Sequence, residues 1–118
     1  MNLMLVDYKG GTSFGPLVRL PHCAGQVTDL TPLLAQRALS GLRAELRRRE
    51  RVVEASGAGD VLDMDPGTAP ASLVIVIDEF ATLLEELPEF VDGVLDIARR
   101  GRSLGIHLIM ATQRPTGV

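Results

Sequence analysis

Two adjacent carboxylates follow the most apolar segment of the 118-residue sequence. Residues 73–77 are five consecutive aliphatic residues, and Asp78 and Glu79 come directly after them. A continuous apolar run rich in β-branched residues is typical of a central parallel strand that is buried on both faces. In such sheets, ligands bind beyond the carboxyl ends of the strands. Asp78 and Glu79 are therefore expected where a ligand would bind.

The residues themselves leave two interpretations of this acidic pair open. In the first, the strand exits into an acidic turn that caps the next helix. In the second, the pair is a Walker B element, in which Asp78 holds Mg²⁺ through water and Glu79 orients and polarises an attacking water. That chemistry needs two carboxylates, because charge neutralisation by the metal and activation of water are separate tasks in phosphoryl transfer.

A second polar pair ends the next apolar segment. A strand is expected over residues 106–111, and Thr112 and Gln113 follow it shortly before Pro115. A glutamine in this place can contact a γ-phosphate or the attacking water. The alternative is a plain strand terminator ahead of the proline. The position of the pair, one strand after the carboxylates, favours the phosphate contact.

A cluster of arginines is predicted on a long helix. Thr31 suits an N-cap, Pro32 suits the first helical position, and Gly57 suits the C-terminal end, so a helix is expected over residues 32–55. Its cluster consists of Arg43, Arg47, Arg48, Arg49 and Arg51. Three roles are open: a solvated face paired with nearby glutamates, a guanidinium that enters a neighbouring subunit's phosphate site, or contact with a DNA backbone.

The other segments complete an alternating pattern. A strand is expected over residues 2–6, with Asp7 at its end, and an exposed connector over residues 56–72. Two helical pieces broken at Pro88 then separate the strand 73–79 from the strand at 106–113. Alternating strands and helices predict an α/β fold with a mostly parallel sheet.

Composition limits the classes of protein. The net charge is −3, with eight basic and five acidic residues in 1–59 but four and ten in 60–118. A globally basic nucleic-acid binder is therefore not indicated. Aromatic residues make up 3%, too few for a base-stacking platform. The single cysteine, Cys23, excludes an internal disulfide. No apolar run approaches the ~20 residues that span a membrane.

Taken together, these segments resemble the FtsK/SpoIIIE family of ring-forming motor ATPases over nearly the whole chain. The most specific stretch is residues 98–115, ARRGRSLGIHLIMATQRP, and residues 74–80, VIVIDEF, match as well. Residues 6–11, VDYKGG, and 42–50, LRAELRRRE, look more like the type VII secretion ATPases of the EccC/EssC type than like chromosome translocases.

The resemblance implies a three-layer RecA-like P-loop NTPase core that uses ATP and Mg²⁺. It makes Asp78 the magnesium-holding aspartate and Glu79 the catalytic base. Gln113, beside Thr112, becomes the sensor of the γ-phosphate. The family activity that follows is ATP hydrolysis coupled to translocation of a polymer.

The resemblance also implies a homo-oligomeric ring, a hexamer in the complete protein. It makes Arg48 or Arg49 the candidate arginine that acts in trans on the neighbouring subunit. The implied cargo is a protein substrate, or double-stranded DNA as in the chromosome translocases. The implied location is cytoplasmic, with no direct membrane insertion by this segment. Whether a larger parent protein is tethered to the inner face of the cell membrane stays open.

One departure from the family pattern limits the expected activity. The spacing G-x-x-x-x-G-K-[ST] occurs nowhere in the 118 residues, and Lys9 is not placed to replace it. Residues 1–118 are therefore expected to be a partial ATPase domain without its first strand and Walker A loop, inactive in isolation. The alternatives are a non-catalytic oligomerisation or interaction module that keeps the fold, and a small DNA-associated protein that uses the arginine helix.

Overall fold

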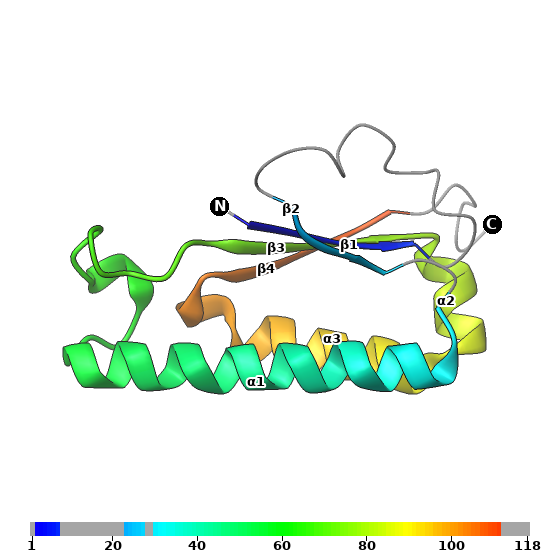
Figure 1. The fold of residues 1–118 in the computed structure, drawn as a ribbon, viewed down its shortest axis with the longest axis horizontal. Coiled ribbons are helices and arrows are strands. Elements are labelled where there is room, and N and C mark those ends of the chain that lie inside the picture. The colour runs from blue at the N-terminus through cyan, green and yellow to red at the C-terminus, as the bar shows by residue number, and fades with distance from the viewer. Residues whose placement is uncertain (1, 8–22, 28–29, 112–118) are drawn as a thin grey trace.

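The computed structural model describes residues 2–7, 23–27 and 30–111, which form a parallel sheet with helices packed beneath it (Figure 1). In chain order the strands and α-helices are β1 (Asn2–Asp7), β2 (Cys23–Val27), α1 (Pro32–Ser56), β3 (Leu73–Asp78), α2 (Phe80–Glu86), α3 (Pro88–Arg100) and β4 (Ile106–Met110). Short 3₁₀ turns, η2 (Val61–Asp63) and η3 (Arg102–Leu104), precede β3 and β4.

The strands lie in the order β2-β1-β3-β4, and every pairing between neighbours is parallel. β3 is central, with β1 on one side and β4 on the other. Its register aligns Ile77 with Val6 on β1 and with Met110 on β4. The predicted α/β class with a parallel sheet is confirmed.

Local signals account for the ends of α1. The hydroxyl of Thr31 accepts a hydrogen bond from the Leu34 amide at 3.2 Å, and Pro32 occupies the first turn. At the other end Gly57 adopts φ 80°, a left-handed conformation in which glycine has no Cβ to clash. Its amide donates to the Glu54 carbonyl at 3.1 Å.

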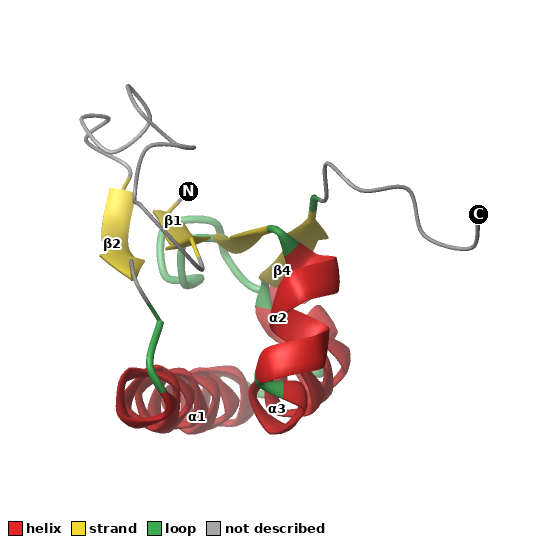
Figure 2. Ribbon diagram, turned by 90° about the vertical axis from the view of Figure 1, so that its right-hand side faces the viewer, coloured by secondary structure: helices red, strands yellow, loops and turns green. Residues whose placement is uncertain are grey.

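The helical region after β3 is divided at Leu87. Pro88 is the first residue of α3, a position where its missing N–H costs no hydrogen bond and its fixed φ suits a helix. α2 lies at the carboxyl end of β3, whereas α3 runs beneath the sheet beside α1 (Figures 1 and 2). Among the described residues, no helix combines the length and apolar character needed to cross a bilayer.

The main core lies between the sheet and the two long helices. Leu46 of α1, Ile77 of β3 and Ile97 of α3 are fully buried there. Gly93 permits the close approach of α1 and α3, since a Cβ at this position would lie 2.8 Å from Cδ2 of Leu39. Burial of this apolar area, at about 25 cal/mol per Å², is the main force that holds the layers together.

The face of the sheet opposite to the helices is less buried among the described residues. In the described part of the chain, helices lie against one face only (Figure 2). On the opposite face Val74 and Val76 are half-buried, and Ile109 near the end of β4 is exposed. Residues 73–77 are expected to be buried on both faces. Among the described residues, burial is complete on the face that the helices cover and partial on the opposite face.

Candidate functional site

The parallel register brings two aspartates together at the carboxyl edge of the sheet. Asp78 ends β3, Asp7 ends β1, and the two are paired in the ladder. Asp78 is 9% exposed and Asp7 is 1% exposed. Val6 and Ile77 belong to the core beneath the sheet, so alternation along the strands directs both aspartates to the opposite face.

Glu79 occupies the turn between β3 and α2. It has φ 58° and ψ 47°, the left-handed region, and its side chain is half-exposed. Its carbonyl accepts a hydrogen bond from the Leu83 amide at 3.1 Å, which begins α2. Although Glu79 is the N-cap residue, its side chain makes no capping bond. The helix-capping interpretation of the acidic pair is therefore not favoured for Glu79.

The end of β4 lies directly beside this turn. The Ala111 amide donates to the Ile77 carbonyl at 2.9 Å, and the Phe80 amide donates to the Ala111 carbonyl at 3.0 Å. Ala111 is thus hydrogen-bonded to the main chain of Ile77 and of Phe80, the residues on either side of Asp78 and Glu79. The predicted sensor residues Thr112 and Gln113 lie outside the described residues, so their expected contact stays a prediction.

The carboxylate oxygens at this edge fit a hydrated magnesium ion as ligands. Mg²⁺ prefers oxygen ligands, keeps several waters, and is usually held by one or two carboxylates together with substrate phosphates. Asp78 supplies a carboxylate at the strand end, with that of Asp7 on the neighbouring strand. Within the described residues, no three His, Cys, Asp or Glu side chains are grouped as a closed metal site. This edge therefore suits an ion that substrate phosphates and water help to hold.

Arg49 does not belong to the solvated face of α1. It is 2% exposed, and its guanidinium makes three hydrogen bonds within the chain. Nη1 donates to the Leu104 carbonyl at 2.8 Å, and Nη2 donates to the Ala71 carbonyl at 2.6 Å. Nε donates to Oε1 of Glu45 at 2.8 Å. Arg49 therefore joins α1 to the segments that lead into β3 and β4.

Arg48, its neighbour, is exposed and held by the same glutamate. Its side chain is 53% exposed, with Nη2 2.6 Å from Oε1 and Nε 3.0 Å from Oε2 of Glu45. The hydrogen bond from Arg48 is the main reason that the pKa of Glu45 lies below its ordinary value, with Arg49 adding to the effect. Of the two finger candidates, Arg48 is thus the one with an accessible guanidinium.

The arginines and the carboxylates lie at opposite edges of the sheet. Ala71 and Leu104, the carbonyl partners of Arg49, precede β3 and β4, whereas Asp78 ends β3. A strand of this length spans roughly 17–20 Å. The arginine pair therefore cannot act on the carboxylates of its own chain, and a role in phosphate binding would have to be in trans.

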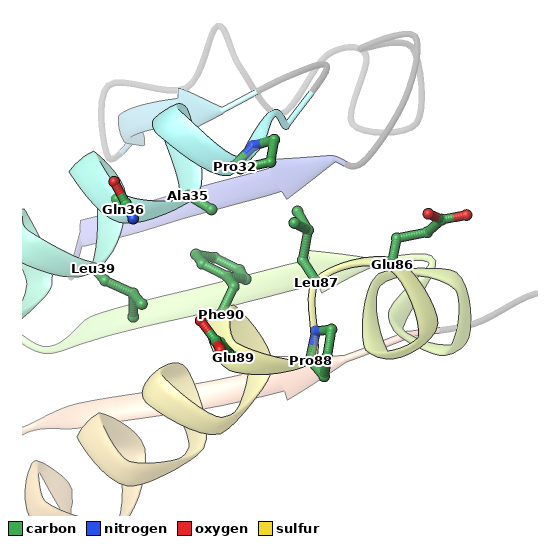
Figure 3. Close-up of a pocket in the computed structure, with 9 residues that line it drawn as sticks. All are labelled: Pro32, Ala35, Gln36, Leu39, Glu86, Leu87, Pro88, Glu89 and Phe90. Atoms are coloured by element: carbon green, nitrogen blue, oxygen red, sulfur yellow. The ribbon is translucent and has the colours of Figure 1, made fainter.

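A separate pocket opens between the start of α1 and the junction of α2 and α3 (Figure 3). Its volume is about 260 Å³. Its lining comprises Pro32, Ala35, Gln36, Leu39, Glu86, Leu87, Pro88, Glu89 and Phe90. The lining is mainly apolar and includes two glutamates but no cation, so it does not suit a phosphate group.

Two features are not assigned from the sequence. The sequence places Asp7 at a strand end but does not pair it with Asp78, although the shared strand-end position is the available signal. The roles predicted for Arg49 do not include burial. Arg49 lies three residues after Leu46 and four before Val53, so it occupies a position on the apolar stripe of α1.

Comparisons with known proteins agree with this geometry. A profile of the FtsK/SpoIIIE family matches residues 63–117. The chain is 42% identical over 125 residues to the type VII secretion system protein EssC of Staphylococcus aureus (strain NCTC 8325 / PS 47), covering 98% of this chain. It is 36% identical over 124 residues to the ESX secretion system protein YukB of Bacillus subtilis (strain 168), again covering 98% of this chain. It spans 8% of the length of each of these relatives.

A solved structure shows the same fold. The cytoplasmic domain of the Thermomonospora curvata type VII secretion ATPase EccC superposes with a TM-score of 0.82 at 33% identity. The match covers 98% of this chain and 14% of that one. The sequence matches, the shared fold and the acidic pair at the end of the central strand agree. The chain therefore belongs to the FtsK/SpoIIIE family and corresponds to part of a type VII secretion ATPase of that family.

Proposed function

We propose that this chain supplies the metal-binding and water-activating half of an ATP site in a type VII secretion motor. The observation that carries the proposal is the acidic pair of a family member placed at the carboxyl edge of a parallel sheet. There Asp78 stands beside Asp7, and the side chain of Glu79 is not used to cap α2. Ligand sites in parallel sheets are found at this edge.

Each carboxylate has a separate proposed task. Asp78 would hold Mg²⁺ through water, and the ion, when bound, neutralises charge on the phosphates of ATP. Glu79 would accept a proton from the water that attacks the γ-phosphate. Gln113, with Thr112, would orient that water or contact the γ-phosphate. The assignments to Gln113 and Thr112 rest on the family resemblance.

Arg48 is the arginine that we propose to act in trans. Its exposed guanidinium sits at the edge of the sheet opposite to its own Asp78. A head-to-tail ring of identical chains would bring one subunit's Arg48 to the next subunit's phosphates. The proposed assembly is therefore a homo-oligomeric ring, a hexamer in the complete protein.

The proposed cargo is protein. The relatives at 42% and 36% identity are secretion proteins, and T. curvata EccC (ATPases 2 and 3), which is 22% identical to this chain, has been solved in complex with a signal sequence peptide. A conjugation coupling protein, TcpA, has the same fold at 26% identity with a TM-score of 0.66 and was solved with ATPγS. It supports ATP as the nucleotide. Double-stranded DNA is the alternative cargo.

The first test is calorimetry of Mg·ATP binding to the 118-residue chain, with Asp78→Ala as the control. We expect weak binding that Asp78→Ala abolishes, because the chain lacks the Walker A spacing that grips phosphates. A folded chain that binds no Mg·ATP would favour a non-catalytic interaction module. Light scattering would then show whether the chain forms defined oligomers without nucleotide.

The second test adds a phosphate-binding loop to the 118 residues. A G-x-x-x-x-G-K-[ST] loop and its strand, grafted upstream of residue 1, should allow ATP turnover. Glu79→Gln in the graft should lower turnover by about 10²–10⁴-fold while ATP still binds. Turnover that Glu79→Gln leaves unchanged would contradict the role of this carboxylate.

A further inference from the structure

The main-chain hydrogen bonds that follow the β3–β4 ladder skip one residue. The ladder ends at the pair of Ile77 and Met110, and continued regular pairing would place Asp78 beside Ala111. The Ala111 amide donates to the Ile77 carbonyl at 2.9 Å, as a parallel ladder requires. In a continued ladder the Ala111 carbonyl would accept from the Glu79 amide, but it accepts from Phe80 at 3.0 Å instead. Glu79 is therefore skipped by these hydrogen bonds, in the turn where β3 ends and α2 begins.

The turn at Glu79 breaks the alternation of the strand. Ile77 lies in the core beneath the sheet, and Asp78 points to the opposite face. Alternation along a continued strand would turn Glu79 back toward the core, where an unpaired carboxylate is strongly disfavoured. The chain turns instead of continuing the strand, and Glu79 is half-exposed.

The backbone at Glu79 is strained. Glu79 is the one residue other than glycine with a positive φ in the part of the chain that the structure describes. This left-handed conformation crowds the Cβ of an L-residue against the following carbonyl, and glycine alone adopts it without that cost. No capping bond of the Glu79 side chain compensates. The main chain around Glu79 must therefore hold it in place.

We propose that Ala111 is a positioning residue for Glu79. Its two main-chain hydrogen bonds, to Ile77 and Phe80, bracket the turn and hold Glu79 in the left-handed conformation. Strain of this kind collects at functional sites where the surrounding structure over-determines it. The inference rests on the proposed function only for the task of Glu79 as the base that activates water.

A series at position 79 tests the strain. We expect Glu79→Gly to raise the folded-to-unfolded ratio about threefold to tenfold over Glu79→Ala in urea unfolding, because glycine relieves the left-handed conformation. Glu79→Gln keeps the same backbone requirement and is the matched control, with stability equal to that of the parent chain. A Gly variant no more stable than the Ala variant would overturn the proposal.

A double-mutant cycle tests the part played by Ala111. Ala111→Pro removes the amide that donates to Ile77. If this bond enforces the strain, the advantage of Gly over Ala at position 79 should fall to near onefold in the Ala111→Pro background. Ala111 acting only as general support would give additive effects, with the Gly advantage unchanged. Additivity would therefore reject its positioning role.

Hydrogen exchange provides a readout that does not need the proline variant to fold. The Phe80 amide, bonded to the Ala111 carbonyl, should exchange more slowly in Glu79→Gly than in Glu79→Ala, by the same factor as the gain in stability. Equal exchange rates at Phe80 in the two variants would contradict a role for the hydrogen bond between Phe80 and Ala111 in holding Glu79. These measurements need no nucleotide, whereas failure of the proposed function would appear as no Mg·ATP binding, or as binding that Asp78→Ala leaves unchanged.

Discussion

The two edges of the sheet hold their polar residues by different means. At the carboxyl edge, Asp78 and Glu79 are placed by the main chain, through strand register and the hydrogen bonds of Ala111 to Ile77 and Phe80. At the amino edge, Arg48 is placed by side chains, since Glu45 holds it and the buried Arg49 holds Glu45. We therefore expect side-chain substitutions at the carboxyl edge to change chemistry with little effect on stability. At the amino edge, substitution of Arg48 should change chemistry, and substitution of its neighbour Arg49 should change stability.

The largest effect is expected from Arg48→Ala in the assembled motor. Loss of an arginine that acts in trans should lower ATP turnover by about 10³–10⁵-fold. The free energy of unfolding should change by less than about 1 kcal/mol, because Arg48 is exposed. Arg47→Ala, at the neighbouring exposed position, is the matched control. An equal loss of turnover in both variants would remove the distinction claimed for Arg48.

Glu79→Gln should have the next largest effect. Removal of a general base typically lowers the rate by about 10²–10⁴-fold. ATP binding and stability should be kept, because the Glu79 side chain makes no capping bond. Steady-state turnover and urea unfolding of the same preparation would separate the two. A clear loss of stability would show that this edge also depends on its side chains.

Arg49→Leu should mainly lower stability, the reverse of the pattern expected for Arg48. Two main-chain carbonyls, of Ala71 and Leu104, would lose their donor. A buried polar group left without a partner costs roughly 1–3 kcal/mol, and the bond to Leu104 is buried whereas the bond to Ala71 is only partly buried, so a loss of about 1–4 kcal/mol is expected. Arg48→Leu is the matched control and should cost less than about 1 kcal/mol. Similar losses in the two variants, measured by chemical unfolding, would refute the assignment of Arg49 as the structural arginine.

Glu45→Gln should give the smallest effect, and one that depends on pH. The pKa of Glu45 is lowered in the folded chain, so its contribution is present above its unfolded pKa of about 4.3 and is lost as pH falls through the lowered folded value. The variant should be less stable by about 0.5–1 kcal/mol at pH 7, and the difference should shrink progressively as pH falls below about 4.3. A difference that does not shrink as the carboxyl becomes protonated would mean that Glu45 acts through packing rather than charge.

Much of the fold could be predicted from the sequence because the signals are local. The run at residues 73–77 indicated a buried strand, and Thr31, Pro32 and Gly57 marked the ends of a helix that extends over Pro32–Ser56. The break between α2 and α3 followed from Pro88, which begins α3. These features need only propensity, spacing and capping chemistry, which neighbouring residues carry.

The acidic pair was recognised from the sequence, but its geometry was not. The position of Asp78 at a strand end follows from the pattern of apolar residues. Its pairing with Asp7 depends on the strand order, which joins residues seventy-one positions apart. The turn at Glu79 likewise depends on a hydrogen bond between Phe80 and Ala111, far apart in the chain.

The sequence by itself determined the alternation of strands and helices, the family and the identity of the acidic pair. The spacing from Leu46 and Val53 puts Arg49 on the apolar stripe of its helix, because successive residues of a helix point about 100° apart. Only the tertiary structure decided what binds its guanidinium, because the carbonyls that accept its hydrogen bonds lie 22 and 55 residues away and are brought beside the helix by the packed core. Arg48, one residue earlier, is left facing water.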